Sequence, residues 1–191
     1  MAIAVTTRTL LALPRRLTFP NLPTTVAPIV TSWDIGATRR HVATITRVLV
    51  RKEIQVARPP AEAFAYVADF SNSAEWDPGI PEARKLTDGP VRQGSEFEVV
   101  ALFRGKRQRF HYVVTAFDAD RRIVLTGEGK KAGSVDEITF EPAGTGTRIV
   151  YVADIRLKGI ARVAEPLLGP TMNRMGDDAL AGLKSVLDRP R

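Results

Sequence analysis

The feature that most limits the fold of this chain is a series of short β-like segments in its second half. They cover residues 84–86, 95–103, 107–117, 122–126, 135–141 and 147–157, and each ends at a turn rich in glycine, proline or aspartate. The connections are short, and a parallel strand pair needs a crossover of a dozen or more residues. The pattern therefore predicts antiparallel hairpins and a sheet of about six to seven strands.

One long amphipathic helix follows the last of these segments. Apolar residues recur at spacings of three and four from Ile160 to Leu187, which predicts a helix of about 28 residues. Pro166 and Pro170 lie in its first half and predict a bend there. A sheet of this size has one face that needs cover, and we expect the helix to supply it.

The start of the domain has a different pattern. A β-like run over residues 48–56 precedes Pro59-Pro60, a helical segment over 61–68 and a second short helix that ends at Trp76. Residues 1–46 hold several prolines and no sustained period of 2 or 3.6. We expect 1–46 to be a flexible basic extension, favoured over a targeting peptide, and 47–188 to form the domain.

Composition excludes several classes of protein. The net charge is +7, but residues 1–50 carry +5 of it, so the rest is a poor footprint for nucleic acid. The chain has no cysteine and two histidines, which excludes thiolate chemistry, and we expect no metal and no cofactor. No apolar run is long enough to span a membrane. The excess of arginine over lysine fits a GC-rich coding bias and does not locate the protein. The absence of cysteine is compatible with a reducing cytoplasm, and we expect a cytoplasmic, bacterial protein.

Several short motifs follow one another along the chain. Residues 50–60 precede the segment AFAYV (63–67), DFSNSAEWDPG covers 69–79, GTRIVY covers 146–151, and LKG at 157–159 leads into the last helix. Over residues 47–188 this arrangement resembles the START-like, helix-grip superfamily (SRPBCC), in its polyketide cyclase/dehydrase and lipid-transport branch. The resemblance implies an α+β fold in which a curved antiparallel sheet wraps round a long C-terminal helix, with two short helices after the first strand.

The resemblance also implies an apolar cavity between sheet and helix, which leaves three functions open. The first is a carrier or sensor that binds a small hydrophobic molecule such as a lipid, a polyketide or a sterol-like compound. The second is a polyketide cyclase or dehydratase that uses the same cavity. The third is a protein-partner module like the Hsp90 activators, with a filled core. The fold does not decide among them, and the oligomeric state stays open.

Strand alternation selects the residues that face the cavity. The expected ligand-binding residues are Trp76, Phe97, Val99, Phe110, Tyr112, Leu125, Ile138, Tyr151, Leu167 and Met175. Plain core packing explains each apolar member equally well. Trp76 suits either a gate at the cavity mouth or a lid for the core.

Catalytic candidates are few. Tyr112 and Tyr151 share the apolar face, where each hydroxyl needs a partner from a ligand, the backbone or water. Alternation places His111 on the opposite face, and so favours a surface histidine over a general base. Asp136 has the parity of Ile138, yet a lone buried charge is costly, which favours a paired or exposed carboxylate at a strand end.

Overall fold

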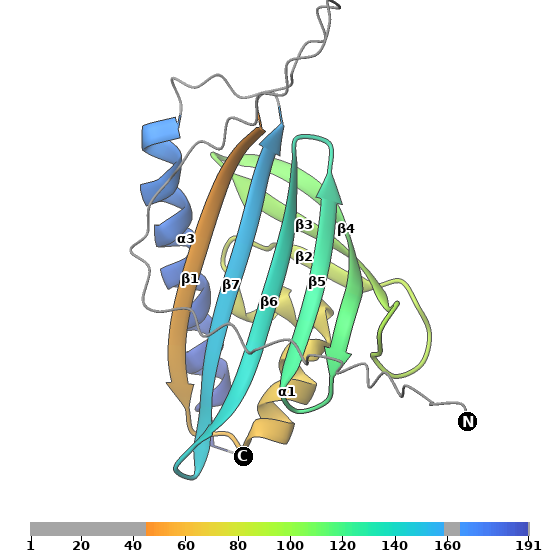
Figure 1. Cartoon of the computed structure of the whole chain (residues 1–191), viewed down its shortest axis with the longest axis vertical. Helices are drawn as coiled ribbons and strands as arrows, with labels where there is room; N and C mark the ends of the chain where they lie inside the picture. The colour runs from red at the N-terminus through yellow and green to blue at the C-terminus, as the bar shows by residue number, and fades with distance from the viewer. Residues whose placement is uncertain (1–44, 159–164, 191) are drawn as a thin grey trace, which may run out of the picture.

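The computed structural model describes residues 45–158 and 165–190 (Figure 1). In chain order it contains β1 (Ile45–Val56), α1 (Pro60–Ala68), a 3-10 turn η1 (Phe70–Asn72), α2 (Ser73–Trp76), β2 (Glu82–Lys85), β3 (Glu96–Phe103), β4 (Lys106–Asp118), β5 (Arg122–Gly129), β6 (Ala132–Ala143), β7 (Gly146–Lys158) and α3 (Glu165–Leu187). The strand β1 thus begins two residues before the expected domain boundary. Residues 1–44 of the expected extension lie outside the described residues.

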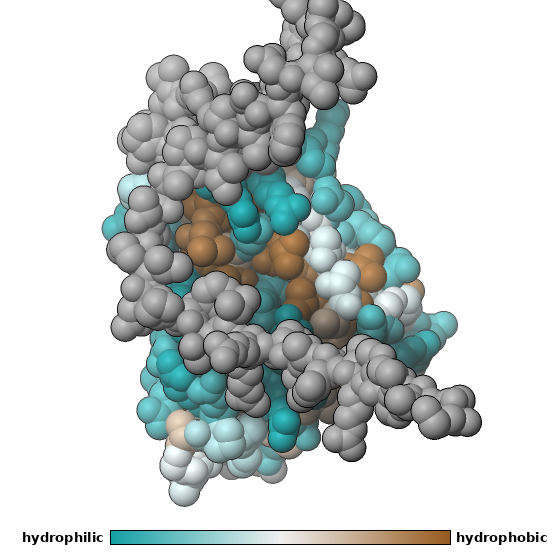
Figure 2. Space-filling view, viewed as in Figure 1, coloured by the Kyte–Doolittle hydropathy of each residue, from teal (hydrophilic) through white to brown (hydrophobic). Residues whose placement is uncertain are grey.

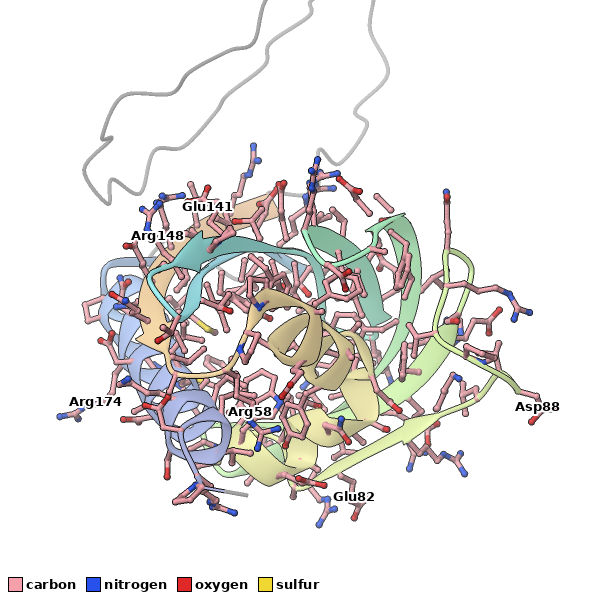
Figure 3. All side chains as sticks on the ribbon, turned by 90° about the horizontal axis from the view of Figure 1, so that it is seen from below. Arg58, Glu82, Asp88, Glu141, Arg148 and Arg174 are labelled. Atoms are coloured by element: carbon pink, nitrogen blue, oxygen red, sulfur yellow. The ribbon has the colours of Figure 1, made fainter. Side chains whose placement is uncertain are left out.

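All seven strands form one antiparallel sheet in the order β1-β7-β6-β5-β4-β3-β2. The first and last strands of the chain are neighbours, while α1 and α2 carry the chain from β1 to the opposite edge at β2. The sheet curves round α3 and the short helices, as the end-on view shows (Figure 3). The expected α+β helix-grip fold is confirmed.

A β-bulge in β4 changes which residues face the helix. The register with β5 shifts between Val114 and Ala116, so that Ala116 pairs with Val124 while Phe117 pairs with the fully buried Ile123. Simple alternation predicts Ala116 on the inner face, and this is wrong because the extra residue reverses the phase of the strand. Phe117 faces inward instead, 5.2 Å from the ring of Phe64 in α1.

The helix α3 lies against the concave face of the sheet beside β1 (Figure 1). A Cβ atom at Gly182 would lie 2.0 Å from the backbone oxygen of Trp76, so only glycine lets α3 approach α2 this closely. Its apolar side is buried through Leu168, Leu180, Leu183 and Leu187. The expected start near Ile160 falls outside the described residues, and the expected bend at its prolines stays a prediction.

The outer face of the sheet is mostly charged and paired. Arg148 of β7 donates to Glu53 at 2.6 Å and to Glu141 at 2.8 Å, and Figure 3 shows Arg148 beside Glu141 on this side. An apolar patch lies among these charges (Figure 2), and Leu49 of β1 is 52% exposed. Scattered apolar surface of this kind is normal for folded proteins.

Candidate functional site

A cavity of about 570 Å³ lies between the concave face of the sheet and α3. Its walls are mainly apolar, and they include Phe70, Phe110, Ala153, Met172 and Met175. A volume of this size is typical of a site for a small molecule, whereas native cores leave few voids larger than a water molecule. The sheet and α3 therefore enclose an apolar cavity of the kind that the resemblance implies.

Half of the expected ligand-binding residues line this cavity. They come from α2, the strands β4 and β7, and α3, and they are Trp76, Phe110, Tyr112, Tyr151 and Met175. The candidate Asp136 lines it too. Strand parity thus reached three of the polar residues of the wall, Tyr112, Asp136 and Tyr151.

Four of the expected residues do not line the cavity. Phe97, Val99, Leu125 and Ile138 are at most 1% exposed and belong to the closed part of the core. The short helices fill this end, and the ring of Phe70 packs against Phe97 at 6.3 Å. The backbone of Leu167 belongs to α3, but its side chain lies outside the described residues.

A chain of hydroxyl groups leads to a buried carboxyl group on the cavity wall. Ser134 Oγ donates to Asp136 Oδ2 at 3.3 Å, and Tyr112 Oη lies 2.8 Å from Ser134 Oγ. Because Ser134 has one hydroxyl proton and gives it to Asp136, Tyr112 is the donor to Ser134. The ring of Tyr112 lies over Gly127, where an added Cβ would come within 2.4 Å of Cε1.

Burial shifts the acid–base behaviour of this cluster. Asp136 is 3% exposed, and desolvation raises its pKa to about 6, although hydrogen bonds from Tyr112, Ser134 and Tyr151 oppose the shift. Burial and the neighbouring Asp136 raise the pKa of both tyrosines well above 10, so they stay neutral donors. The expectation that Asp136 is paired with a cation or exposed is wrong, because hydroxyl donors and a raised pKa accommodate it.

A second carboxyl group was not expected in the site. Asp77 lines the cavity, and its pKa is raised to about 6 by burial and by Asp178, against a backbone hydrogen bond from Gly79 at 2.7 Å. In the sequence Asp77 belongs to an Asp-Pro-Gly segment, which predicts a turn and gives no sign of a cavity residue. Ser134 was missed as well, although it has the parity of Asp136 on β6 and the same reasoning reaches it.

Trp76 covers the core, as one of its two expected roles requires, and its role as a gate stays a prediction. Its side chain is 3% exposed and packs against Phe70, and it also lines the cavity. Its indole Nε1 is buried without a hydrogen-bond partner among the described residues. A buried donor without an acceptor costs about 1–3 kcal/mol, so this indole is a local cost within the packing of α2.

His111 lies on the outer face, as alternation predicted. Its side chain is half exposed, and Nε2 lies 2.9 Å from Glu96 Oε2 on β3. It has no access to the cavity, so it supplies no base there. Among residues 45–158 and 165–190, no three His, Asp or Glu side chains are grouped as metal ligands. None of the helices in these ranges is long and apolar enough to cross a membrane.

Comparison with protein families agrees with this architecture. The family described as "Polyketide cyclase / dehydrase and lipid transport" matches residues 47–188. The chain belongs to this family. The expected START-like membership is confirmed, and with it hydrophobic-ligand binding or cyclase chemistry as functions at the level of the family. A search of curated proteins found no match to the sequence.

Solved structures share the fold at low sequence identity. TTHA0849 from Thermus thermophilus is 20% identical, with a TM-score of 0.63 over 72% of this chain and 94% of the other. The ZhuI aromatase/cyclase from Streptomyces sp. R1128 is 16% identical, with a TM-score of 0.62 over 74% and 93%. A START superfamily protein from Mycobacterium smegmatis is 18% identical, with a TM-score of 0.58 over 73% and 94%. At these identities the likeness concerns the fold alone.

Proposed function

We propose that this protein binds a small hydrophobic molecule, such as a lipid, a polyketide or a sterol-like compound, and acts as its carrier or sensor. The observation that carries the proposal is the unfilled apolar cavity of about 570 Å³ in a domain that is otherwise tightly packed. Burial of about 200 Å² of apolar ligand surface contributes about 5 kcal/mol, part of which offsets the loss of freedom on binding. Apolar burial is therefore the main source of affinity.

The polar groups of the wall give the ligand an orientation. Tyr151 on the cavity wall stays a neutral hydroxyl donor, beside the carboxyl group of Asp136, whose pKa of about 6 leaves it mainly ionised at neutral pH. Donors of this kind recognise a carbonyl, ether or hydroxyl oxygen. The ligand accordingly carries at least one such oxygen on the part that enters most deeply.

One observation favours a cyclase or dehydratase as the second candidate. General acid–base catalysis is most efficient when the pKa lies near the working pH, and the pKa of Asp136 is about 6. Tyr112 and Tyr151 stay neutral, and through their hydrogen bonds to Ser134 and Asp136 they hold this carboxyl group in place. Asp136→Asn would then abolish turnover of a polyketide substrate and leave its binding intact.

A protein-partner module fits the structure less well. That function requires a filled core, whereas the described domain holds a large cavity. Figure 2 shows apolar side chains on the outer face among hydrophilic ones, and charged residues of this face such as Arg148 and Glu53 are paired. We therefore do not develop this alternative.

The test is direct identification of a bound molecule. The full chain is purified without detergent or organic solvent, measured by native mass spectrometry and then extracted for analysis of the released compound. A stoichiometric hydrophobic adduct supports the proposal and names the ligand class. An empty mass that does not shift with a panel of fatty acids, sterols and aromatic polyketides contradicts it. A cytoplasmic location stays part of the same proposal, and cell fractionation tests it.

A further inference from the structure

The solvent-exposed part of the cavity wall has a single chemical character. Its exposed residues are Arg104, Lys106, Lys131 and Lys158, and all of them are basic. The other lining residues are buried or half-buried. These four residues, called the basic rim below, therefore mark where the described cavity meets solvent.

The fold brings the basic rim together from three separate segments. Arg104 and Lys106 flank Gly105 at the turn between β3 and β4, and Lys131 lies in the turn between β5 and β6. Lys158 is the last residue of β7. Figure 1 shows both turns and the end of β7 at the same end of the molecule, opposite α1.

The β3–β4 turn holds its two cations by local geometry. Arg104 and Gly105 have positive φ angles of 51° and 72°, as a tight two-residue hairpin requires. Lys106 follows directly, pairs with Phe103, and has the same parity as Phe110 and Tyr112. It is therefore the first of the inward-facing residues of β4, which extend from the basic rim to Tyr112 and its hydrogen-bonded partners Ser134 and Asp136.

The charge of the basic rim is largely uncompensated. Within the described part of the chain, Arg104, Lys106 and Lys131 have no carboxylate within 4.0 Å, and Arg104 lies over the ring of Phe103. Lys158 alone is paired, with Glu128 at 2.8 Å. The arginines of the outer face differ, since those such as Arg148 are held by carboxylates. Unpaired cations at the edge of an apolar cavity attract and orient an anion.

We propose that the ligand is an amphipathic anion, whose apolar body fills the cavity and whose carboxylate, sulfate or phosphate head lies at the basic rim. This inference rests on the proposed function and narrows its ligand class. The apolar body contacts Phe110, Met172 and Met175. The basic rim supplies charge-assisted hydrogen bonds to the head, and these weaken as salt is added.

A matched pair of fluorescent probes tests separately whether the cavity binds an apolar body and whether the basic rim binds an anionic group. N-phenyl-1-naphthylamine is neutral, and 8-anilinonaphthalene-1-sulfonate has the same aromatic body with an added sulfonate. Both are titrated against the full-length protein and its Lys106→Gln/Lys131→Gln variant. The control is Arg51→Gln/Arg174→Gln, which changes net charge equally on the outer face of β1 and on the outward side of α3, where Figure 3 shows Arg174 pointing to solvent.

The expected result is a loss of sulfonate affinity in the rim variant alone. Loss of two exposed charge contacts is expected to weaken the Kd for the sulfonate roughly tenfold, which is about 1.4 kcal/mol, and to leave the Kd of the neutral probe within about twofold of wild type. The control variant keeps both affinities.

Three results would overturn the inference. Equal binding of both probes by wild type and rim variant means that the cavity has no preference for anions. Unchanged probe affinities combined with lost binding to phosphatidylglycerol vesicles would assign the basic rim to a membrane surface. Failure of wild type to bind the neutral probe would remove the cavity proposal itself, which distinguishes that failure from the other two.

Discussion

Asp136→Asn is expected to stabilise the ligand-free protein at neutral pH. Asp136 lies on the cavity wall, and its charged form has lost water without gaining a cation. The asparagine keeps a carbonyl oxygen that accepts from Ser134, and it removes the charge. The substitution therefore relieves an electrostatic cost at little cost in packing.

The size and sign of the expected change in stability follow from the shift in the pKa of Asp136. The pKa of Asp136 rises from 3.8 to about 6, and each pKa unit corresponds to 1.36 kcal/mol, which gives about 3 kcal/mol in total. Between these values the unfolded chain has lost the proton and the folded chain keeps it. The stability of wild type therefore falls as pH rises from about 4 to 6, and it becomes level above the folded pKa.

The assay is urea unfolding followed by circular dichroism on lipid-stripped protein at several pH values between 4 and 8. We expect the free energy of unfolding of Asp136→Asn, relative to wild type, to increase by roughly 2–3 kcal/mol across this range. Asp77 titrates in the same range and its charge acts on Asp136, so the comparison is repeated in an Asp77→Asn background to separate the two carboxyl groups. A difference that does not change with pH would refute the reasoning.

Asp154→Asn is a control, because it should change the free energy of unfolding in the opposite direction. Asp154 loses water on burial, but hydrogen bonds from Arg47 and Arg156 outweigh this and lower its pKa. Its contribution to stability is therefore present at neutral pH and is lost as pH falls through the lowered pKa. Asp154→Asn should destabilise the protein at pH 7, with a smaller effect in acid.

Three further substitutions test the placement of individual side chains. Gly127→Ala should destabilise the protein by about 1–3 kcal/mol, because the new Cβ meets the ring of Tyr112, and the same change in a Tyr112→Ala background should cost much less in urea unfolding. Leu183→Ala removes a fully buried side chain of α3 and should cost about 2–5 kcal/mol, whereas Leu49→Ala on the exposed face should cost under about 0.5 kcal/mol by the same assay. His111→Gln should leave probe affinity unchanged within about twofold, because this histidine faces away from the cavity, and a large loss would contradict its outer placement.

The sequence predicts the architecture well because turn signals and helical periodicity are local. Gly105, Gly144 and their neighbours mark the hairpins, and α3 shows its apolar spacing directly. The bulge near Ala116 has no such signal, since one extra residue changes the phase of β4 without a turn. Alternation therefore failed only beyond that point of the strand.

The cavity could be predicted only in part because its wall and the closed core use the same residue types. Ile138 and Asp136 are neighbours of equal parity on β6, yet only Asp136 lines the cavity. What separates them is how far the short helices reach along the sheet, which depends on packing between distant segments. Part of the basic rim could have been predicted from the sequence, since Lys106 has the same strand parity as Tyr112.

The central claim is that the cavity binds a hydrophobic ligand, and filling it is the most direct test. Ala153 lines the cavity on β7, and Val152 beside it faces the opposite side of the sheet, so Ala153→Phe and Val152→Phe add the same side chain on the two faces. Binding of N-phenyl-1-naphthylamine is measured by fluorescence for wild type and both variants, after circular dichroism shows that each is folded. We expect Ala153→Phe to weaken the Kd at least about tenfold, or about 1.4 kcal/mol, and Val152→Phe to leave it within about twofold. Equal affinity in all three proteins would contradict ligand binding in this cavity.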